Sequence, residues 1–322
     1  MTSATTSMLA AIALATAMTG AAAQDYPSRP VRIVVPYAAG GPSDTGTRLA
    51  AEPLARELGR PIVIENRGGG GGLNATEAYV KSEHDGYTIL VGAIGPLTII
   101  PALKPVSYDP EKDFAPLSTV WRSAQVLAVR PSLGVKSMVE FVAYAKANPG
   151  KVTLGSAGVG AVTHLAIEVL KREASLDLIH VPFRSTSESL PALLGGQIDG
   201  LFGDGPTIAP QVQSGHIIAL AVASPKRVLA LPEVATMAEA GYPGIESESW
   251  FGLVVSSKTP APITKRLQDA LVTAQRDPAY QASLAKQGAS AGEPGPESFG
   301  KLIRKDAAKW KAIIQAAGIK VE

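Results

Sequence analysis

The chain has 322 residues, 46% of them hydrophobic and 5% aromatic, which is enough for one large or two medium cores. Its formal net charge of +2 and its lack of a long Lys/Arg run argue against nucleic-acid binding and a polybasic membrane contact. It contains no cysteine, which excludes disulfides, thiolate zinc sites and a cysteine nucleophile.

The first 23 residues are predicted to be a signal peptide. Residues 8–18 form an apolar run of 11 residues, too short to span a bilayer, and residues 21–23 form a small-residue cleavage site. Residues 1–7 carry no Lys or Arg, so the usual basic region is missing and the true start codon is open. We expect a soluble, exported periplasmic protein.

Residues 31–58 read as a buried strand, a glycine turn and an amphipathic helix. The apolar run 31–35 is typical of a central parallel strand, and the glycines at 40–41 let the backbone turn. Ser43 or Asp44 is expected to cap the helix. The N-terminus of such a helix can hold an anion. The phosphate motifs G-x-x-x-x-G-K-[ST] and G-x-G-x-x-G are absent, so a carboxylate is favoured.

The rest of the chain alternates strand-like and helix-like segments, which predicts an α/β fold with mostly parallel sheets flanked by helices. Strands are expected at 62–65, 88–91, 127–129, 152–155, 178–181, 198–202, 217–223 and 250–255. Helices are expected at 73–81, 137–147, 161–174, 185–195, 206–215, 263–276, 278–287 and 297–317. Ser137 with Glu140, and Ser185 with Glu188, have the capping-box spacing.

Two stretches, near 118–125 and near 241–250, are candidate crossings between lobes. They divide the mature chain into a first lobe of residues 24–121 plus 248–322 and a second lobe of residues 122–247. Ligands of open α/β sheets bind beyond the carboxyl ends of the strands. A binding cleft between the two lobes is therefore expected.

Five turns after predicted strands carry glycine and small polar residues, and they would line this cleft if the strands meet there. These turns are residues 37–44, 66–74, 92–98, 156–164 and 202–207. The second turn contains five consecutive glycines, residues 68–72. This tract forms either a flexible surface loop or a lip of the cleft.

The fourth turn suggests a hydrolase, but Leu154 stands where the motif G-x-S-x-G requires its first glycine. Ser156 is instead expected to offer its hydroxyl to a ligand oxygen, with Gly158 and Gly160 allowing close backbone approach. His164 either helps to polarise the site or is a hydrogen-bonded helix residue.

Several other residues near strand ends leave two interpretations open. Arg184 either clamps a ligand carboxylate with its planar fork or is a surface charge. Asp204 either accepts from a ligand hydroxyl or ammonium or caps the helix after Pro206. Trp250 and Phe251 pack either beside the cleft or in the core.

A metal or cofactor site is not expected. The histidines at 84, 164, 180 and 216 show neither H-x₃-H nor H-E-x-x-H spacing. The acidic residues 109–113 loosely resemble a calcium loop, but Phe114 occupies the position of its glycine.

Taken in order, these segments resemble the extracytoplasmic solute receptors of tripartite tricarboxylate transporters, the Bug family. The resemblance covers essentially the whole mature chain, and its blocks include YPSRPVRIVVPYAAGGPSD, GRPIVIENRGGGGG, VTLGSAGVGAVTHLA, LLGGQIDGLFGD and GASAGEPGPESFGKLIRKDAAKWKAIIQAAGI. Many members have Lys within V-P-Y-K-G where this chain has Arg184, whose planar fork suits a second ligand carboxylate.

The resemblance implies a two-lobed periplasmic-binding-protein fold of the Venus-flytrap type, without catalysis. Its ligand would be a di- or tricarboxylate, an aromatic acid or an amino acid. The loops that match the family imply these ligand-binding residues: Tyr37, Ala39, Gly41, Ser43, Asp44, Ala93, Ile94, Thr98, Ser156, Ala157, Gly158, Thr163, His164, Arg184 and Asp204.

We expect a monomer that hands its ligand to a membrane transporter. A sensing module that presents the ligand to a signalling partner is one alternative, and a neighbouring permease or kinase gene would distinguish the two. A periplasmic hydrolase of organic acids is the enzymatic alternative, but the sequence shows no nucleophile with a base in reach.

Overall fold

The computed structural model describes residues 26–317. Its strands are β1 (Val31–Val35), β2 (Ile62–Asn66), β3 (Thr88–Ala93), β4 (Phe114–Val129), β5 (Thr153–Ser156), β6 (Ile179–Pro182), β7 (Gly200–Asp204), β8 (Ile218–Val222) and β9 (Glu248–Ser256). Its α-helices are α2 (Pro42–Leu58), α3 (Leu73–Val80), α4 (Ile100–Leu103), α5 (Met138–Ala147), α6 (Val162–Glu173), α7 (Thr186–Leu194), α8 (Gly205–Gln213), α9 (Ala261–Gln275), α10 (Pro278–Lys286) and α11 (Pro296–Ala317). Short helical turns are η2 (Gly70–Gly72), η3 (Gly95–Ile99) and η4 (Pro131–Leu133). The expected signal peptide lies outside the described residues.

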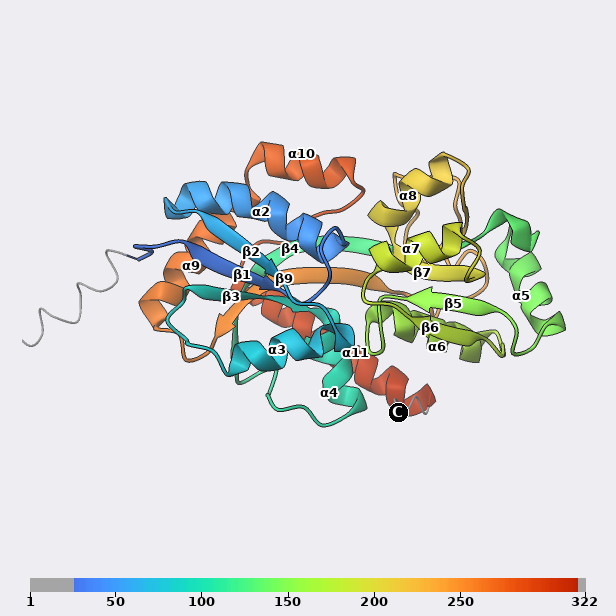
Figure 1. Cartoon of the computed structure of the whole chain (residues 1–322), viewed down its shortest axis with the longest axis horizontal. Helices are drawn as coiled ribbons and strands as arrows, with labels where there is room; N and C mark the ends of the chain where they lie inside the picture. The colour runs from blue at the N-terminus through green and yellow to red at the C-terminus, as the bar shows by residue number, and fades with distance from the viewer. Residues whose placement is uncertain (1–25, 318–322) are drawn as a thin grey trace, which may run out of the picture.

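The strands follow the order β2-β1-β3-β9-β4-β7-β5-β6, with β8 paired to β4. The outer pairs, β1 with β2 and β3 and β5 with β6 and β7, are parallel as expected. The inner pairs around β4 and β9 are antiparallel. Figure 1 shows β1–β3 in one half and β5–β7 in the other, which gives the expected two-lobed α/β fold.

The strand β4 is much longer than the three residues expected for it, because it runs through both lobes. Residues 114–124 pair with β9 in the first lobe, and residues 125–129 pair with β7 in the second. A search for apolar runs does not find this strand, because Pro116 and several polar residues interrupt its sequence. Two register shifts interrupt its ladder with β9, between residues 116 and 118 and between 119 and 121.

Helices cover both faces of each part of the sheet, as the alternating pattern predicts. In the first lobe, α2, α9 and α10 bury their apolar faces on one side, while α3 and part of α11 cover the other. In the second lobe, α5 and α6 pack on one face and α7 and α8 on the other. Gly46 of α2 brings the helix onto β4, where a Cβ would lie 2.8 Å from the Trp121 Cβ.

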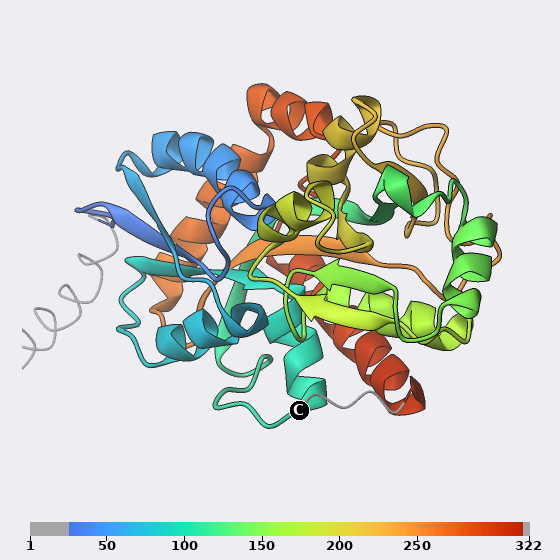
Figure 2. The same ribbon diagram turned by 45° about the vertical axis from the view of Figure 1, so that its right-hand side comes forward.

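The last helix connects the two lobes on one side of the molecule. Trp310 and Ile314 of α11 share a hydrophobic cluster with Val162 and Leu165 of α6. Figure 2 shows α11, in red, running from beneath the first lobe to beneath the second. Between residues 26 and 317, no helix combines the length and the apolar character needed to cross a membrane.

Candidate functional site

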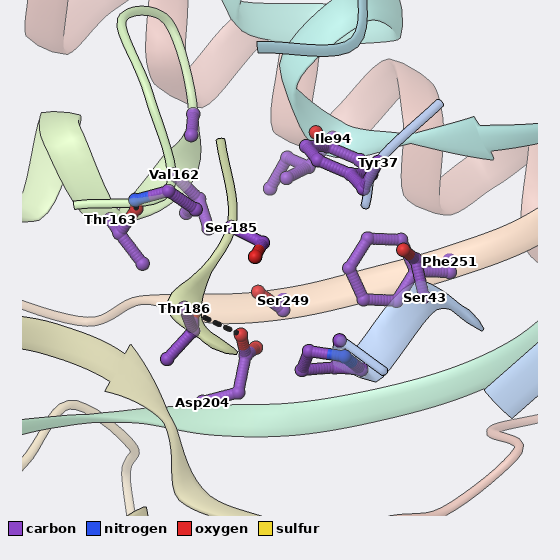
Figure 3. A pocket seen from close by; sticks show the side chains of 14 residues that line it. Tyr37, Ser43, Ile94, Val162, Thr163, Ser185, Thr186, Asp204, Ser249 and Phe251 are labelled. Carbon is purple, nitrogen blue, oxygen red and sulfur yellow. Dashed lines mark hydrogen bonds between the residues drawn. The ribbon is translucent and has the colours of Figure 1, made fainter. Parts of the chain in front are cut away.

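A cavity lies between the lobes, where strands of both parts of the sheet end (Figure 3). The space between its lining atoms, including the part that is open to solvent, is about 400 Å³. Residues expected from the sequence form half of its lining: Tyr37, Gly41, Ser43, Ile94, Ala157, Thr163 and Asp204. The other half is Pro42, Ala161, Val162, Ser185, Thr186, Ser249 and Phe251.

Four helices from the two lobes begin at this cavity. Their N-cap residues, Gly41 for α2, Ala161 for α6, Ser185 for α7 and Asp204 for α8, all line it. First-turn amides have no partner within a helix, and aligned peptide dipoles place roughly half a positive charge at each N-terminus. The backbone alone therefore makes this cavity suitable for an anion.

The start of α2 differs from the expectation. Its N-cap is Gly41, and neither Ser43 nor Asp44 caps the helix, because Pro42 already occupies the first helical position. Ser43 lines the cavity, whereas the Asp44 carboxylate accepts a hydrogen bond at 2.9 Å from the backbone N–H of Gly40. Asp44 therefore holds the glycine turn in place.

Asp204 is the carboxyl group of the cavity wall, and among the described residues no Lys or Arg lines this cavity. Its Oδ1 accepts from the Gln125 amide at 2.9 Å and from the Ser123 hydroxyl at 3.3 Å, and its Oδ2 accepts from the Thr186 hydroxyl at 3.1 Å. Asp204 is the N-cap residue of α8, as one alternative expected, but its side chain makes no hydrogen bond to the helix. Burial raises the pKa of the Asp204 carboxyl.

Ser156 lies behind the wall of the cavity and contacts a histidine that the sequence did not suggest. Its Oγ lies 2.6 Å from Nε2 of His180, and it is fully buried. The same Oγ accepts the N–H of Gly158 at 3.1 Å. The pair fixes the loop that carries Ala157 and Thr163 into the cavity.

His164 stacks on His180 with ring centroids 4.2 Å apart. Its Nδ1 accepts the N–H of Gly160 at 3.3 Å, and its side chain does not line the cavity. Burial lowers the pKa of both histidines to about 4, so both rings are neutral at pH 7. This environment matches the alternative of a hydrogen-bonded helix residue.

Five other expected residues lie outside the lining. Ala39 is exposed, Ala93 is buried within β3, and Thr98 lines a different cavity beside α11. Gly158 and Arg184 line an outer groove together with residues 69–71 of the first lobe. Arg184 is exposed there.

Of the seven lining residues that were not named as ligand residues, three lie in turns that were expected at the cleft, and the other four do not. Ser185 and Thr186 sit in the turn after β6, where the sequence showed only a helix cap and an arginine. This turn follows a strand just as the five candidate turns do, and its position after a strand could have identified it as a further candidate. Ser249 and Phe251 lie within β9, which passes the cavity along its length and offers no turn motif.

No group of three or more His, Asp or Glu side chains within residues 26–317 is arranged to hold a metal ion.

The chain matches a family model described as the tripartite tricarboxylate transporter family receptor over residues 47–319. Among curated relatives, the protein BugT of Bordetella pertussis is 31% identical over 323 residues, which cover 98% of this chain and 99% of BugT. The similarity thus extends over nearly the whole of both proteins.

Two solved structures are similar at the same level. MatC of Rhodopseudomonas palustris, solved with bound malate, is 32% identical with a TM-score of 0.86 and covers 90% of this chain and 100% of its own. An R. palustris protein solved with adipate is 31% identical with a TM-score of 0.87, covering 92% and 99%. Both have a dicarboxylate as the named ligand.

Proposed function

The chain belongs to the tripartite tricarboxylate transporter receptor family, and from this premise we propose that it is a periplasmic receptor for a small carboxylate. It captures the acid in the interlobe cavity and delivers it to a membrane transporter. The observation that carries the proposal is the meeting of the α2, α6 and α7 N-termini at one cavity between the lobes.

A carboxylate in this cavity accepts hydrogen bonds from first-turn amides of α2 on one side and of α6 and α7 on the other. Charge-assisted hydrogen bonds contribute about 1.5–3 kcal/mol each. Micromolar affinity requires about 8 kcal/mol, so a few such bonds suffice after ordering costs. Because the donors belong to both lobes, the bound acid stabilises the closed arrangement.

Asp204 narrows the ligand class. Its buried carboxyl faces the same cavity and has no cation beside it in the lining. A ligand hydroxyl or ammonium next to Asp204 could donate to this carboxyl, whereas a second carboxylate there would be repelled. Malate and adipate in two relatives support a small diacid, and Asp204 favours one that carries a hydroxyl or an ammonium group.

The structure places a serine beside a histidine, as a hydrolase would require, but it places no substrate site next to them. Ser156 has no exposed surface, and neither Ser156 nor His180 lines the cavity. A nucleophile must reach the scissile bond of its substrate. We therefore propose a structural role for this pair and a receptor without turnover.

The remaining expected residues act, in this proposal, around the ligand rather than on it. Asp44, Ser156, Gly158 and His164 hold the loops that carry the donors. Arg184, at the outer groove, attracts incoming acids toward the cleft. The exported, mature chain works as a monomer.

A ligand screen tests the proposal. Malate, adipate, aspartate and an aromatic acid are added to the purified protein, and melting temperature and calorimetric heat are measured. At least one acid is expected to raise the melting temperature, with no product detected by mass spectrometry. No shift with any acid would refute the carboxylate assignment, and product formation would refute the receptor.

A further inference from the structure

Within the glycine tract of residues 68–72, Gly68 and Gly70 are exposed, whereas Gly71 is buried and touches the second lobe. A Cβ built on Gly71 would come closer than 3.0 Å to the carbonyl oxygen of Val159, a distance that real Cβ atoms essentially never show. It would also lie 3.5 Å from the backbone nitrogen of Ala161. Because both partners are backbone atoms, no side-chain rotation can make room for it.

Two further glycines complete this contact. A Cβ on Gly95 of the first lobe would lie 2.9 Å from the carbonyl oxygen of Gly71 and 3.2 Å from that of Gly160. A Cβ on Gly160 of the second lobe would lie 2.7 Å from Cγ1 of Ile100 in the first. We call Gly71, Gly95 and Gly160 the glycine joint.

The first-lobe side of the joint is held in place by hydrogen bonds. The hydroxyl of Tyr37 donates to the carbonyl of Gly71 at 3.1 Å, and the hydroxyl of Thr76 donates to that of Gly72 at 2.9 Å. The N–H of Gly72 donates to the carbonyl of Gly69 at 3.1 Å. Tyr37 also lines the cavity, so one side chain connects the joint to the ligand site.

A separate contact also crosses between the lobes. The hydroxyl of Ser187 in α7 donates to the carbonyl of Gly40 at 3.0 Å. In this structure the Ser187–Gly40 bond and the glycine joint are made at the same time. The backbone of the first lobe therefore touches the second at two points beside the ligand site.

We propose that the glycine joint positions the two lobes in the closed receptor. The missing Cβ atoms let the backbones meet, and the depth of that approach determines whether the helix N-termini of both lobes reach one ligand. Gly71, Gly95 and Gly160 do not themselves line the cavity. This inference rests on the proposed function in one respect, because acid binding is one of the two measurements that test it.

Gly71→Ala and Gly59→Ala form a matched pair for the test. Gly71 has φ 64° and ψ 21°, and Gly59 has φ 67° and ψ 22°, so alanine introduces the same local backbone strain at both. Nothing lies within 4 Å of a Cβ on Gly59. We expect Gly71→Ala to weaken acid binding by about tenfold or more, because the closed population falls, and Gly59→Ala to leave it unchanged.

A second readout needs no ligand. The cysteine-free chain allows spin labels on cysteines introduced at the exposed positions Arg60 and Lys146, one in each lobe. Pulsed electron paramagnetic resonance is expected to show longer interlobe distances for Gly71→Ala than for Gly59→Ala. If no acid binds the parent protein, the proposed function fails while this measurement still tests the joint.

A compensating pair covers the case in which Gly71→Ala does not fold. Gly160→Ala is expected to lengthen the interlobe distance, and adding Ile100→Ala is expected to restore it by removing the Cγ1 that the new methyl meets. Equal distances in Gly71→Ala and Gly59→Ala overturn the proposal. The proposal is also overturned if the interlobe distance of the double variant, Gly160→Ala with Ile100→Ala, stays as long as that of Gly160→Ala alone.

Discussion

Replacing Asp204 by Asn tests the charge of the cavity. Asn keeps the size of the side chain and can still hydrogen-bond to Gln125 and Thr186, but it removes the negative charge. A ligand carboxylate and Asp204 would share one cavity, and we take a separation of about 9 Å to set the magnitude. At an effective dielectric constant of about 20, two unit charges about 9 Å apart repel by about 1.8 kcal/mol. Asp204→Asn is therefore expected to bind a simple diacid roughly 20-fold more tightly at pH 8.

Isothermal titration calorimetry with adipate and aspartate at pH 8 and pH 5 measures this effect. An amino acid whose ammonium pairs with Asp204 is expected to bind the variant more weakly than the parent. Because burial raises the pKa of Asp204, the parent carboxyl takes up its proton as the pH falls through that pKa. The difference between parent and variant is then expected to shrink as the pH is lowered.

Asp306→Asn is the control, because Asp306 is a second carboxyl whose pKa burial raises, and it lines a different cavity, where it accepts from the Trp250 indole at 2.6 Å. It is expected to leave both affinities unchanged. Identical affinities of the parent and Asp204→Asn for both acids at pH 8 would refute the reasoning. An equal gain from Asp306→Asn would show that overall charge, and not the position of Asp204, is responsible.

Three further predictions concern stability and the outer groove. Gly46→Ala is expected to lower the melting temperature, since its Cβ would lie 2.8 Å from the Trp121 Cβ and overpacking costs about 1–3 kcal/mol; Gly300→Ala, with no atom nearer than 3.4 Å, is the helical control and is expected not to lower it. His180→Gln is expected to reduce the loss of stability in acid. Burial lowers the pKa of His180 from 6.5 to about 4, so between these pH values the unfolded parent binds a proton that the folded parent does not. Melting curves of both proteins over this pH range test the prediction. Arg184→Ala is expected to slow diacid association in stopped-flow fluorescence while changing affinity by less than about threefold; a larger loss would place its guanidinium on the ligand.

Local signals predicted most of the helices and strands of this fold. Both serine N-caps are confirmed, with the Ser137 and Ser185 side chains accepting from the N–H groups of Glu140 and Glu188. The strand β4 was the main failure, because its middle is polar and its burial depends on partners more than 100 residues away. Tertiary pairing, which no local pattern records, determines such a strand.

The candidate site was predictable in part for the same reason. Parallel strands bring their following turns to one edge, so the turns at residues 37–44, 156–164 and 202–207 were correctly expected to meet. The contact between Ser156 and His180 depends on the register of β5 against β6, and Ser249 reaches the cavity from an antiparallel strand. Neither could be read from residue spacing.

The course of β4 and β9 restricts how the lobes can move. The two strands lie side by side in an antiparallel ladder, and β4 continues unbroken into the second lobe, where its partner changes between Ala124 and Gln125. The connection between the lobes is thus a hydrogen-bonded ribbon and not a pair of loose linkers. We expect the lobes to open by bending of this ribbon with the β4–β9 ladder kept, so that closure on a ligand does not have to re-form it.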